Sequence, residues 1–253
     1  MTPFPFSKSP VTDLSQKPPY YVSNFGFWTG VTDYREAGIQ FLDEFAKQCG
    51  LEKNKSILEV GSGLGGSLVY WKDQYEADKL SAINLPGEQS NFAKQLFHDQ
   101  NLEVTPFLEG GWEGIKTLPS NSYDYVFSVD AAYHFNPIDE FYRESYRILK
   151  PGGKLVFNVF HLHEIEKKKY SGLLSFFLIP PNQVKVLDVT VEELQTIGYL
   201  IEKNLDWTIP VINGFVQNKS KMKLLLQIFG FVLQTITKTL KLSYHYYVVQ
   251  KPI

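Results

Sequence analysis

The feature that most constrains the fold is a glycine cluster set between a strand-like run and a helix-like run. The segment ILEVGSGLGG occupies residues 57–66. Gly61, Gly63 and Gly66 match the pattern GxGxxG, in which glycines permit a tight turn and let a ligand lie against bare backbone. A strand, a glycine turn and a helix in this order predict an α/β sheet with a ligand site at its carboxyl edge. The pattern alone does not say which ligand.

Strand-like and helix-like segments alternate along the rest of the chain. Seven segments read as strands, at residues 56–60, 80–85, 104–108, 123–129, 154–160, 200–209 and 242–250. A long helical insertion at residues 221–241 precedes the last of them. The alternation predicts βαβ units in a doubly wound, mostly parallel sheet with helices on both faces.

Length, charge and cysteine content narrow the classes of protein. A chain of 253 residues with one continuous sheet pattern is expected to form a single domain over residues 1–253. One cysteine excludes an internal disulfide and favours a reducing, cytoplasmic setting. A net charge of −2 argues against nucleic acid as a partner.

Three segments are expected to lie over the carboxyl edge of the sheet. Residues 1–32, rich in Pro and Ser near their start, read as an N-terminal arm or lid. Residues 165–190 and 210–241 are apolar insertions that would form a cap over the substrate, although packing on the sheet explains them equally well. The uncharged run 224–237 is short of the roughly 20 residues that span a bilayer, so no transmembrane span is expected. Its flanking lysines leave peripheral membrane contact open.

Glu59 bears on the choice of ligand, because it stands two residues before the first glycine. A carboxylate there repels a phosphate and attracts a cation. S-adenosyl-L-methionine carries an ammonium and a sulfonium and no phosphate, so it suits this turn. A solvated or loop-capping carboxylate is the alternative interpretation.

Three motifs, taken in order, resemble the class I S-adenosylmethionine-dependent methyltransferases of the small-molecule type. They are ILEVGSGLGG, then LPSNSYDYVFSVDAAYHF at 118–135, then RILKPGGKLVF at 147–157. The resemblance covers about residues 20–160. It implies a Rossmann-like sheet of seven strands with an antiparallel last strand, S-adenosyl-L-methionine as cofactor, and in-line methyl transfer to a small molecule.

The resemblance also implies where the cofactor is held. The cofactor-binding residues expected from it are Tyr21, Trp28, Glu59, Gly61, Ser62, Gly63, Asn84, Leu85, Gln89, Gly111, Trp112, Ser128, Val129 and Asp130. Asn84 stands where the family usually has an acid that grips the ribose hydroxyls, and an Asx turn before Pro86 is an equal alternative. Gly111 stands where an Asp often reads the adenine, which leaves apolar contact from Trp112, or plain core packing of that side chain.

The acceptor side of the site is expected to involve Phe25, Tyr133, His134 and His161. His134 is the candidate catalytic base or positioning group, because imidazole titrates near neutral pH, and a structural histidine is the alternative. No metal is expected, since neither HExxH nor CxxC spacing occurs. The apolar insertions suggest an apolar or aromatic acceptor.

Two other functions remain as alternatives. The missing acids at Asn84 and Gly111 would suit a cofactor-binding scaffold that has lost activity. A nicotinamide-dependent oxidoreductase would use the same glycine pattern, but it calls for no acid before the turn and an acid about 20 residues after it. The identity of the acceptor, the methylated atom and the oligomeric state stay open.

Overall fold

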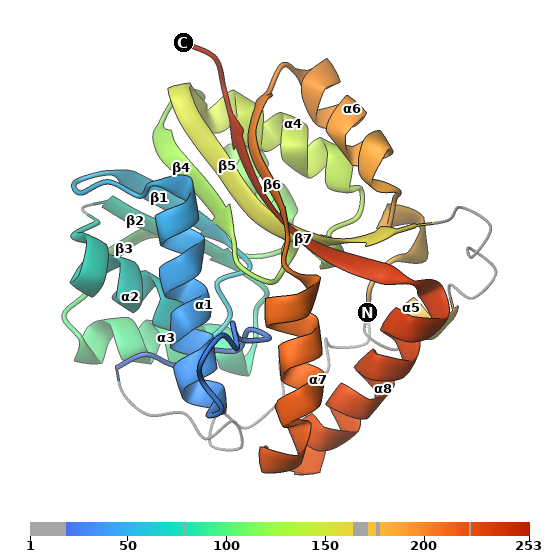
Figure 1. Cartoon of the computed structure of the whole chain (residues 1–253). Helices are drawn as coiled ribbons and strands as arrows, with labels where there is room; N and C mark the ends of the chain where they lie inside the picture. The colour runs from blue at the N-terminus through green and yellow to red at the C-terminus, as the bar shows by residue number, and fades with distance from the viewer. Residues whose placement is uncertain (1–18, 78, 164–171, 176–177, 223) are drawn as a thin grey trace.

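The computed structural model describes residues 19–77, 79–163, 172–175, 178–222 and 224–253 (Figure 1). Seven strands form one sheet in the order β3-β2-β1-β4-β5-β7-β6. Their bounds are β1 Ser56–Val60, β2 Lys79–Asn84, β3 Val104–Glu109, β4 Tyr123–Ser128, β5 Leu149–Leu162, β6 Leu200–Asp206 and β7 Leu242–Gln250. The last strand, β7, runs antiparallel to both of its neighbours, while β1 to β5 pair in parallel. The predicted fold class is confirmed.

Helices cover both faces of this sheet. The α-helices are α1 Tyr34–Cys49, α2 Gly66–Tyr75, α3 Glu88–Asp99, α4 Ile138–Ile148, α5 Gly172–Ser175, α6 Leu187–Ile197, α7 Gly214–Asn218 and α8 Leu224–Leu240. Phe127 of β4 packs on one face against Phe45 of α1 and Trp71 of α2. Phe157 of the adjacent strand packs on the other face against Tyr142 of α4. The helices α7 and α8 stand side by side below the sheet (Figure 1).

Local sequence explains where the first helix begins and ends. The Asp33 side chain accepts a hydrogen bond from the backbone N–H of Glu36 at 3.0 Å, which caps the amino end of α1. Gly50 ends the helix in the left-handed conformation, at φ 64°. The helix buries a stripe that includes Phe41 and Phe45, four residues apart on one face.

Two strands differ from the prediction. Strand β5 begins at Leu149, and the Pro-Gly-Gly segment that reads as a turn lies within it as a bulge opposite Tyr123 and Tyr125. Strand β6 ends at Asp206 rather than continuing to residue 209. The chain then turns into a π-helical segment, Thr208–Asn213, because the Asp206 carboxylate accepts from the Thr208 N–H and Pro210 has no N–H for a sheet.

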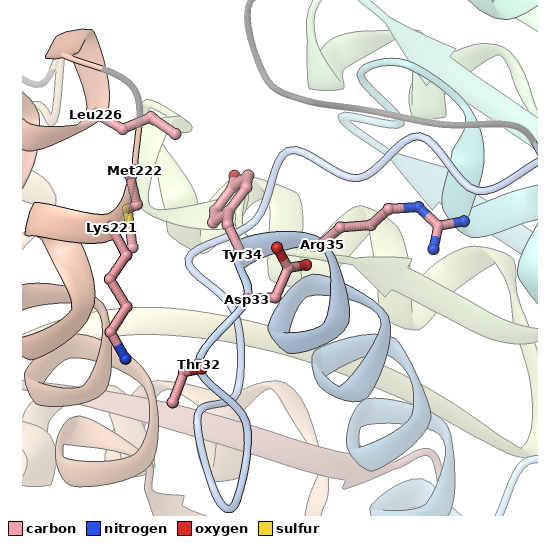
Figure 2. Close-up of a pocket in the computed structure, with 7 residues that line it drawn as sticks. All are labelled: Thr32, Asp33, Tyr34, Arg35, Lys221, Met222 and Leu226. Carbon is pink, nitrogen blue, oxygen red and sulfur yellow. The ribbon is translucent and has the colours of Figure 1, made fainter.

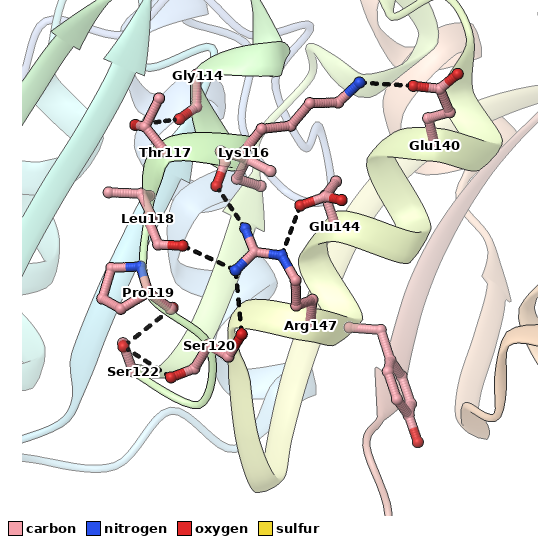
Figure 3. Close-up of polar contacts among 12 residues, drawn as sticks. Gly114, Lys116, Thr117, Leu118, Pro119, Ser120, Ser122, Glu140, Glu144 and Arg147 are labelled. Carbon is pink, nitrogen blue, oxygen red and sulfur yellow. Dashed lines mark hydrogen bonds and ion pairs between the residues drawn. The ribbon is translucent and has the colours of Figure 1, made fainter.

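Arg147 joins α4 to the segment between β3 and β4 (Figure 3). Its guanidinium donates to the backbone oxygens of Ile115 and Leu118, to Ser120 Oγ and to the Glu144 carboxylate. Ile115 belongs to a 3-10 helix, Trp112–Thr117, so this one side chain fixes that helix against α4. The position of Trp112 at the carboxyl edge of the sheet follows from this arrangement.

The described part of the chain contains no helix that is both long enough and apolar enough to cross a membrane. Some predicted features lie outside the described residues, namely 1–18 of the arm, 165–171 and 176–177 of the first insertion, and 223 of the second.

Candidate functional site

The glycine turn joins β1 to α2 at the carboxyl edge of the sheet. Gly61 and Gly63 both have positive φ, at 82° and 54°, which a side chain would resist. A Cβ on Gly61 would lie 2.6 Å from the Ala131 Cβ. The N–H of Gly61 donates to the oxygen of Ile83 at 2.7 Å, so the turn is held against the end of β2. At the carboxyl edge of the sheet, a ligand would therefore meet the backbone of this turn and no side chains of Gly61 or Gly63.

Asn84 holds the glycine turn from the end of β2. Its Oδ1 accepts from the Gly63 N–H at 3.1 Å, and its Nδ2 donates to the Gly63 oxygen and to Ser90 Oγ. Both ends of the amide are thus engaged within the protein. The bonds to Gly63 reach 21 residues back along the chain, so they are not those of an Asx turn at Pro86, which has no N–H to donate. The ribose role expected for Asn84 stays a prediction.

Glu59 is 1% exposed, so the interpretation as a solvated carboxylate is wrong. Its Oε2 accepts a hydrogen bond from Ser67 Oγ of α2 at 2.6 Å. Burial raises the pKa of this carboxyl to about 8, and the bond from Ser67 opposes part of that rise. The turn therefore has a buried acid beside it, and a nearby cation would favour the ionised form of that acid.

Asp130 connects the arm, the end of β4 and β7. Its carboxylate accepts from the Phe25 N–H at 2.7 Å, the Tyr133 hydroxyl at 2.9 Å and the Tyr244 hydroxyl at 2.6 Å. Its backbone has a φ of 52°, unusual for a residue with a side chain, and strain of this kind concentrates at functional sites. Burial raises its pKa to about 6. We call this arrangement the Asp130 latch, because it ties the arm down over the edge of the sheet.

The arm closes directly over the start of α2. A Cβ on Gly66 would lie 2.1 Å from the backbone oxygen of Tyr21, so only glycine permits this approach. The Tyr21 ring packs edge-on against Phe92 of α3, with 4.9 Å between centroids. The expected contact of Tyr21 with a cofactor stays a prediction, but its place beside the turn suits one.

Aromatic side chains from five different elements surround Phe25. Its ring lies 5.8–6.4 Å, between centroids, from those of Tyr133, Phe160, Phe215, Phe229 and Tyr244. Phe215 belongs to α7 and Phe229 to α8, so the second apolar insertion meets the arm here. We call this set the aromatic cluster.

The remaining acceptor-side residues lie in different places. His134 Nδ1 donates to the Leu178 oxygen at 3.1 Å, and its ring lies 4.4 Å from that of Tyr133. Burial lowers the pKa of His134 to about 4, so the imidazole is neutral at physiological pH. Phe160 and its neighbour His161 point to opposite faces of β5, as successive strand residues do. His161 bonds the Tyr247 hydroxyl and the Lys185 oxygen, away from the aromatic cluster.

Trp28 packs within the arm and against α7. Its Nε1 donates to the Phe25 oxygen, and its ring packs against Phe215 and Tyr34. A Cβ on Gly214 would lie 2.4 Å from the Trp28 Cβ. These contacts join the arm to α7, and the expected contact of Trp28 with the cofactor stays a prediction.

The other expected cofactor residues line the ends of the strands. Ser62 and Ser128 are buried, and within the described residues their hydroxyl oxygens have no hydrogen-bond partner, nor has Trp112 Nε1. Val129 and Gln89 are half-buried, Leu85 is exposed, and Gly111 precedes the helix that carries Trp112. These three buried polar groups lie near the glycine turn and are available to hydrogen-bond a polar ligand such as the expected cofactor. The 14 expected residues remain predictions as binding residues.

Sequence reasoning missed Tyr244 and Ser67. Tyr244 lies on β7, far along the chain from Asp130, and only the alternation in LSYHYYVV hints that it faces the same side as Tyr246. Ser67 follows the glycines directly, where a hydroxyl can reach back to the preceding strand. No group of His, Cys, Asp and Glu in the described residues is arranged to hold a metal ion.

Comparison with known proteins agrees with this fold. The chain is 24% identical over 133 residues to an erythromycin 3''-O-methyltransferase of Saccharopolyspora erythraea, covering 52% of this chain and 44% of that one. It is 31% identical over 114 residues to a sterol 24-C-methyltransferase of Neurospora crassa, covering 43% and 28%. The chain thus spans less than half the length of these curated relatives.

A solved structure matches over nearly the whole chain. It is a putative sarcosine dimethylglycine methyltransferase from Galdieria sulphuraria, with a TM-score of 0.76, 16% identity, and coverage of 90% of this chain and 93% of that one. Residues 58–157 match the family model described as a methyltransferase domain, and this stretch contains the glycine turn, β4 and most of β5. Over those residues the chain is similar to the methyltransferase-domain family, and its whole sheet adopts the Rossmann-like fold.

Proposed function

We propose that this chain binds S-adenosyl-L-methionine at the glycine turn and transfers its methyl group to a small, apolar or aromatic molecule. The observation that carries the proposal is the buried Glu59 beside a turn that contains no Lys or Arg from residue 56 to residue 71. A phosphate-bearing cofactor would gain nothing there, whereas an ammonium group would gain a charge partner in a site of low dielectric. The match of residues 58–157 to the methyltransferase-domain model supports the same conclusion.

The bound cofactor supplies an activated methyl group on a sulfonium, which is a good leaving group for in-line displacement. The work left to the protein is to align the acceptor and to exclude water. The Asp130 latch holds Phe25 over the edge of the sheet, and the aromatic cluster offers the acceptor an apolar wall. His134 would position the acceptor or take its proton, although its lowered pKa makes it a weak base.

We also propose that residues 1–32, 165–190 and 210–241 act together as an arm and a cap within one domain. The ring contacts of Phe25 with Phe215 and Phe229 support this, because they join the arm to the second insertion. The named relatives range from a macrolide enzyme to a sterol enzyme and a putative sarcosine dimethylglycine enzyme, so they do not indicate one acceptor. The expectation of an apolar acceptor therefore rests on the aromatic cluster. A cytoplasmic setting is part of the proposal, supported by a chain with a single cysteine.

Calorimetry with two ligands tests the cofactor. The wild type should bind S-adenosylmethionine and not NAD, and Glu59→Ala should lower the affinity at least tenfold. Glu52→Ala is the matched control. It removes an exposed acid that lies just before β1 in the sequence, and it should leave the affinity unchanged. Equal affinity of Glu59→Ala and wild type, or tighter binding of NAD, would contradict the proposal.

One observation favours the second candidate, a scaffold that binds the cofactor without activity. The Asn84 amide is fully engaged with the glycine turn and Ser90, which leaves the ribose without the usual acid. Incubation with methyl-labelled S-adenosylmethionine and a panel of lipophilic phenols, amines and acids separates the two. Transfer of label to any acceptor supports the enzyme, and tight binding with no transfer over the panel favours the scaffold.

A further inference from the structure

The outer face of α8 is apolar and exposed, which is unusual for a helix of a folded domain. Leu224, Ile228 and Phe231 are 70%, 53% and 64% exposed. Their spacing of four and three residues places them on one side of the helix. The opposite side is buried through Leu233, Ile236 and Leu240. The helix therefore has two apolar faces, and only one of them is needed by the core.

The charged side chains of the segment that carries this face are all lysines. From residue 207 to residue 253 the chain has six lysines and no Asp, Glu or Arg, although the whole chain has a net charge of −2. Lys221, just before the helix, and Lys238, seven residues after Phe231 on the same side, are both exposed. Positive charge is thus concentrated on the segment that carries the exposed apolar face.

We propose that this face of α8, with Lys221 and Lys238 at its two ends, docks the protein onto an anionic lipid membrane. An apolar stripe that enters the headgroup region between lysines that meet lipid phosphates is the pattern of an interfacial helix. A second copy of this chain would instead bring the same lysines together, and the like charges would repel. The proposal concerns attachment only, and it does not depend on the proposed methyl transfer.

The exposed face of α8 lies close to a cavity between the arm and the second insertion. A cavity of about 460 Å³ lies beside the amino end of α8, lined by Lys221, Met222 and Leu226 on one side and by residues 32–35 of the arm and α1 on the other (Figure 2). Figure 2 shows Lys221 extending toward Thr32, with Arg35 directed away. A membrane on the α8 face would thus lie next to the joint between arm and cap.

Vesicle co-sedimentation of the full chain tests the proposal. The wild type should sediment with phosphatidylcholine vesicles that contain about 30% phosphatidylglycerol and should bind at least tenfold more weakly to pure phosphatidylcholine. Lys221→Glu/Lys238→Glu should weaken binding to the anionic vesicles at least tenfold, because each lysine near an anionic surface contributes about fivefold or more to the affinity. Lys53→Glu/Lys79→Glu makes the same change in net charge near the amino ends of β1 and β2 and should have little effect.

The apolar contribution needs its own pair of variants. Ile228→Ser/Phe231→Ser should also lose binding at least tenfold, while Val189→Ser/Leu200→Ser removes exposed apolar side chains elsewhere and should not. All four positions are exposed, so the variants should fold, and an unchanged circular dichroism spectrum checks this. Failure of the wild type to bind anionic vesicles, or binding that ignores both α8 pairs, would overturn the proposal. So would sedimentation analysis in which Ile228→Ser/Phe231→Ser abolishes a dimer of the wild type, because a second copy would then cover the face.

Discussion

Replacing Glu59 by Gln gives a direct measure of the buried acid beside the glycine turn. The pKa of Glu59 is raised from an ordinary value of 4.5 to about 8, chiefly by burial. The difference corresponds to about 5 kcal/mol, taken as an upper bound because a charged site can relax. Since the folded state holds this proton more tightly than the unfolded state does, the stability it contributes is complete below about pH 4.5 and is lost as the pH rises through about 8. Glutamine is neutral at every pH and loses nothing.

Urea unfolding of both proteins between about pH 5 and pH 9 measures this difference. The free energy of unfolding of Glu59→Gln minus that of wild type should rise with pH, by up to about 1.4 kcal/mol per pH unit, and level off above about pH 8. Groups common to both proteins cancel in the difference. Two curves that stay parallel over this range would refute a raised pKa.

The same residue links the acid to the proposed ligand. A cationic ligand beside Glu59 favours the ionised carboxylate, so binding near pH 7 should release about one proton. Calorimetry of S-adenosylmethionine binding in two buffers with different ionisation enthalpies measures that proton. Wild type should release it and Glu59→Gln should not. Equal proton release by both proteins would show that the positive charge of the ligand does not lie beside Glu59.

Three further substitutions test the arrangement around the site. Gly66→Ala should push the arm away, because the new Cβ would lie 2.1 Å from the Tyr21 oxygen. The cofactor affinity measured by calorimetry should then fall roughly tenfold. Gly110→Ala is the control and should have no effect, because open space surrounds that position. Tyr244→Phe removes a buried hydrogen bond to Asp130 and should cost about 1.5–3 kcal/mol in urea unfolding above about pH 7, and less below about pH 5, where this carboxyl is protonated. A loss that is the same at both pH values would contradict the ionic character of the latch. Arg147→Ala should lower the free energy of unfolding by about 2 kcal/mol or more through its lost hydrogen bonds, and Arg143→Ala, exposed on the same helix, should stay within about 0.5 kcal/mol of wild type.

The sequence was sufficient for those parts of the fold that depend on local pattern. The run ILEV followed by glycines predicts a strand and a turn, because glycine adopts the positive φ of Gly61 and Gly63 at the least steric cost. Alternating strands and helices predict the parallel sheet, since a parallel connection needs a crossover helix. The turn in β5 and the end of β6 were less predictable, because a bulge and a strand end depend on the neighbouring strand as well as on the local residues.

Only the tertiary structure decided which distant groups share the site. Asp130, Tyr244 and Phe25 are separated by more than 100 residues along the chain, and pairing of β5 with β7 and closure of the arm bring them together. The sequence by itself determined that Glu59 is an acid beside a glycine turn. Folding determined that it is buried, that its pKa is raised, and that Ser67 is its partner, because burial and hydrogen bonding are properties of what surrounds a group. In the same way, the spacing of α8 predicts a helix from sequence alone, but only packing against the core reveals which of its apolar faces is left exposed.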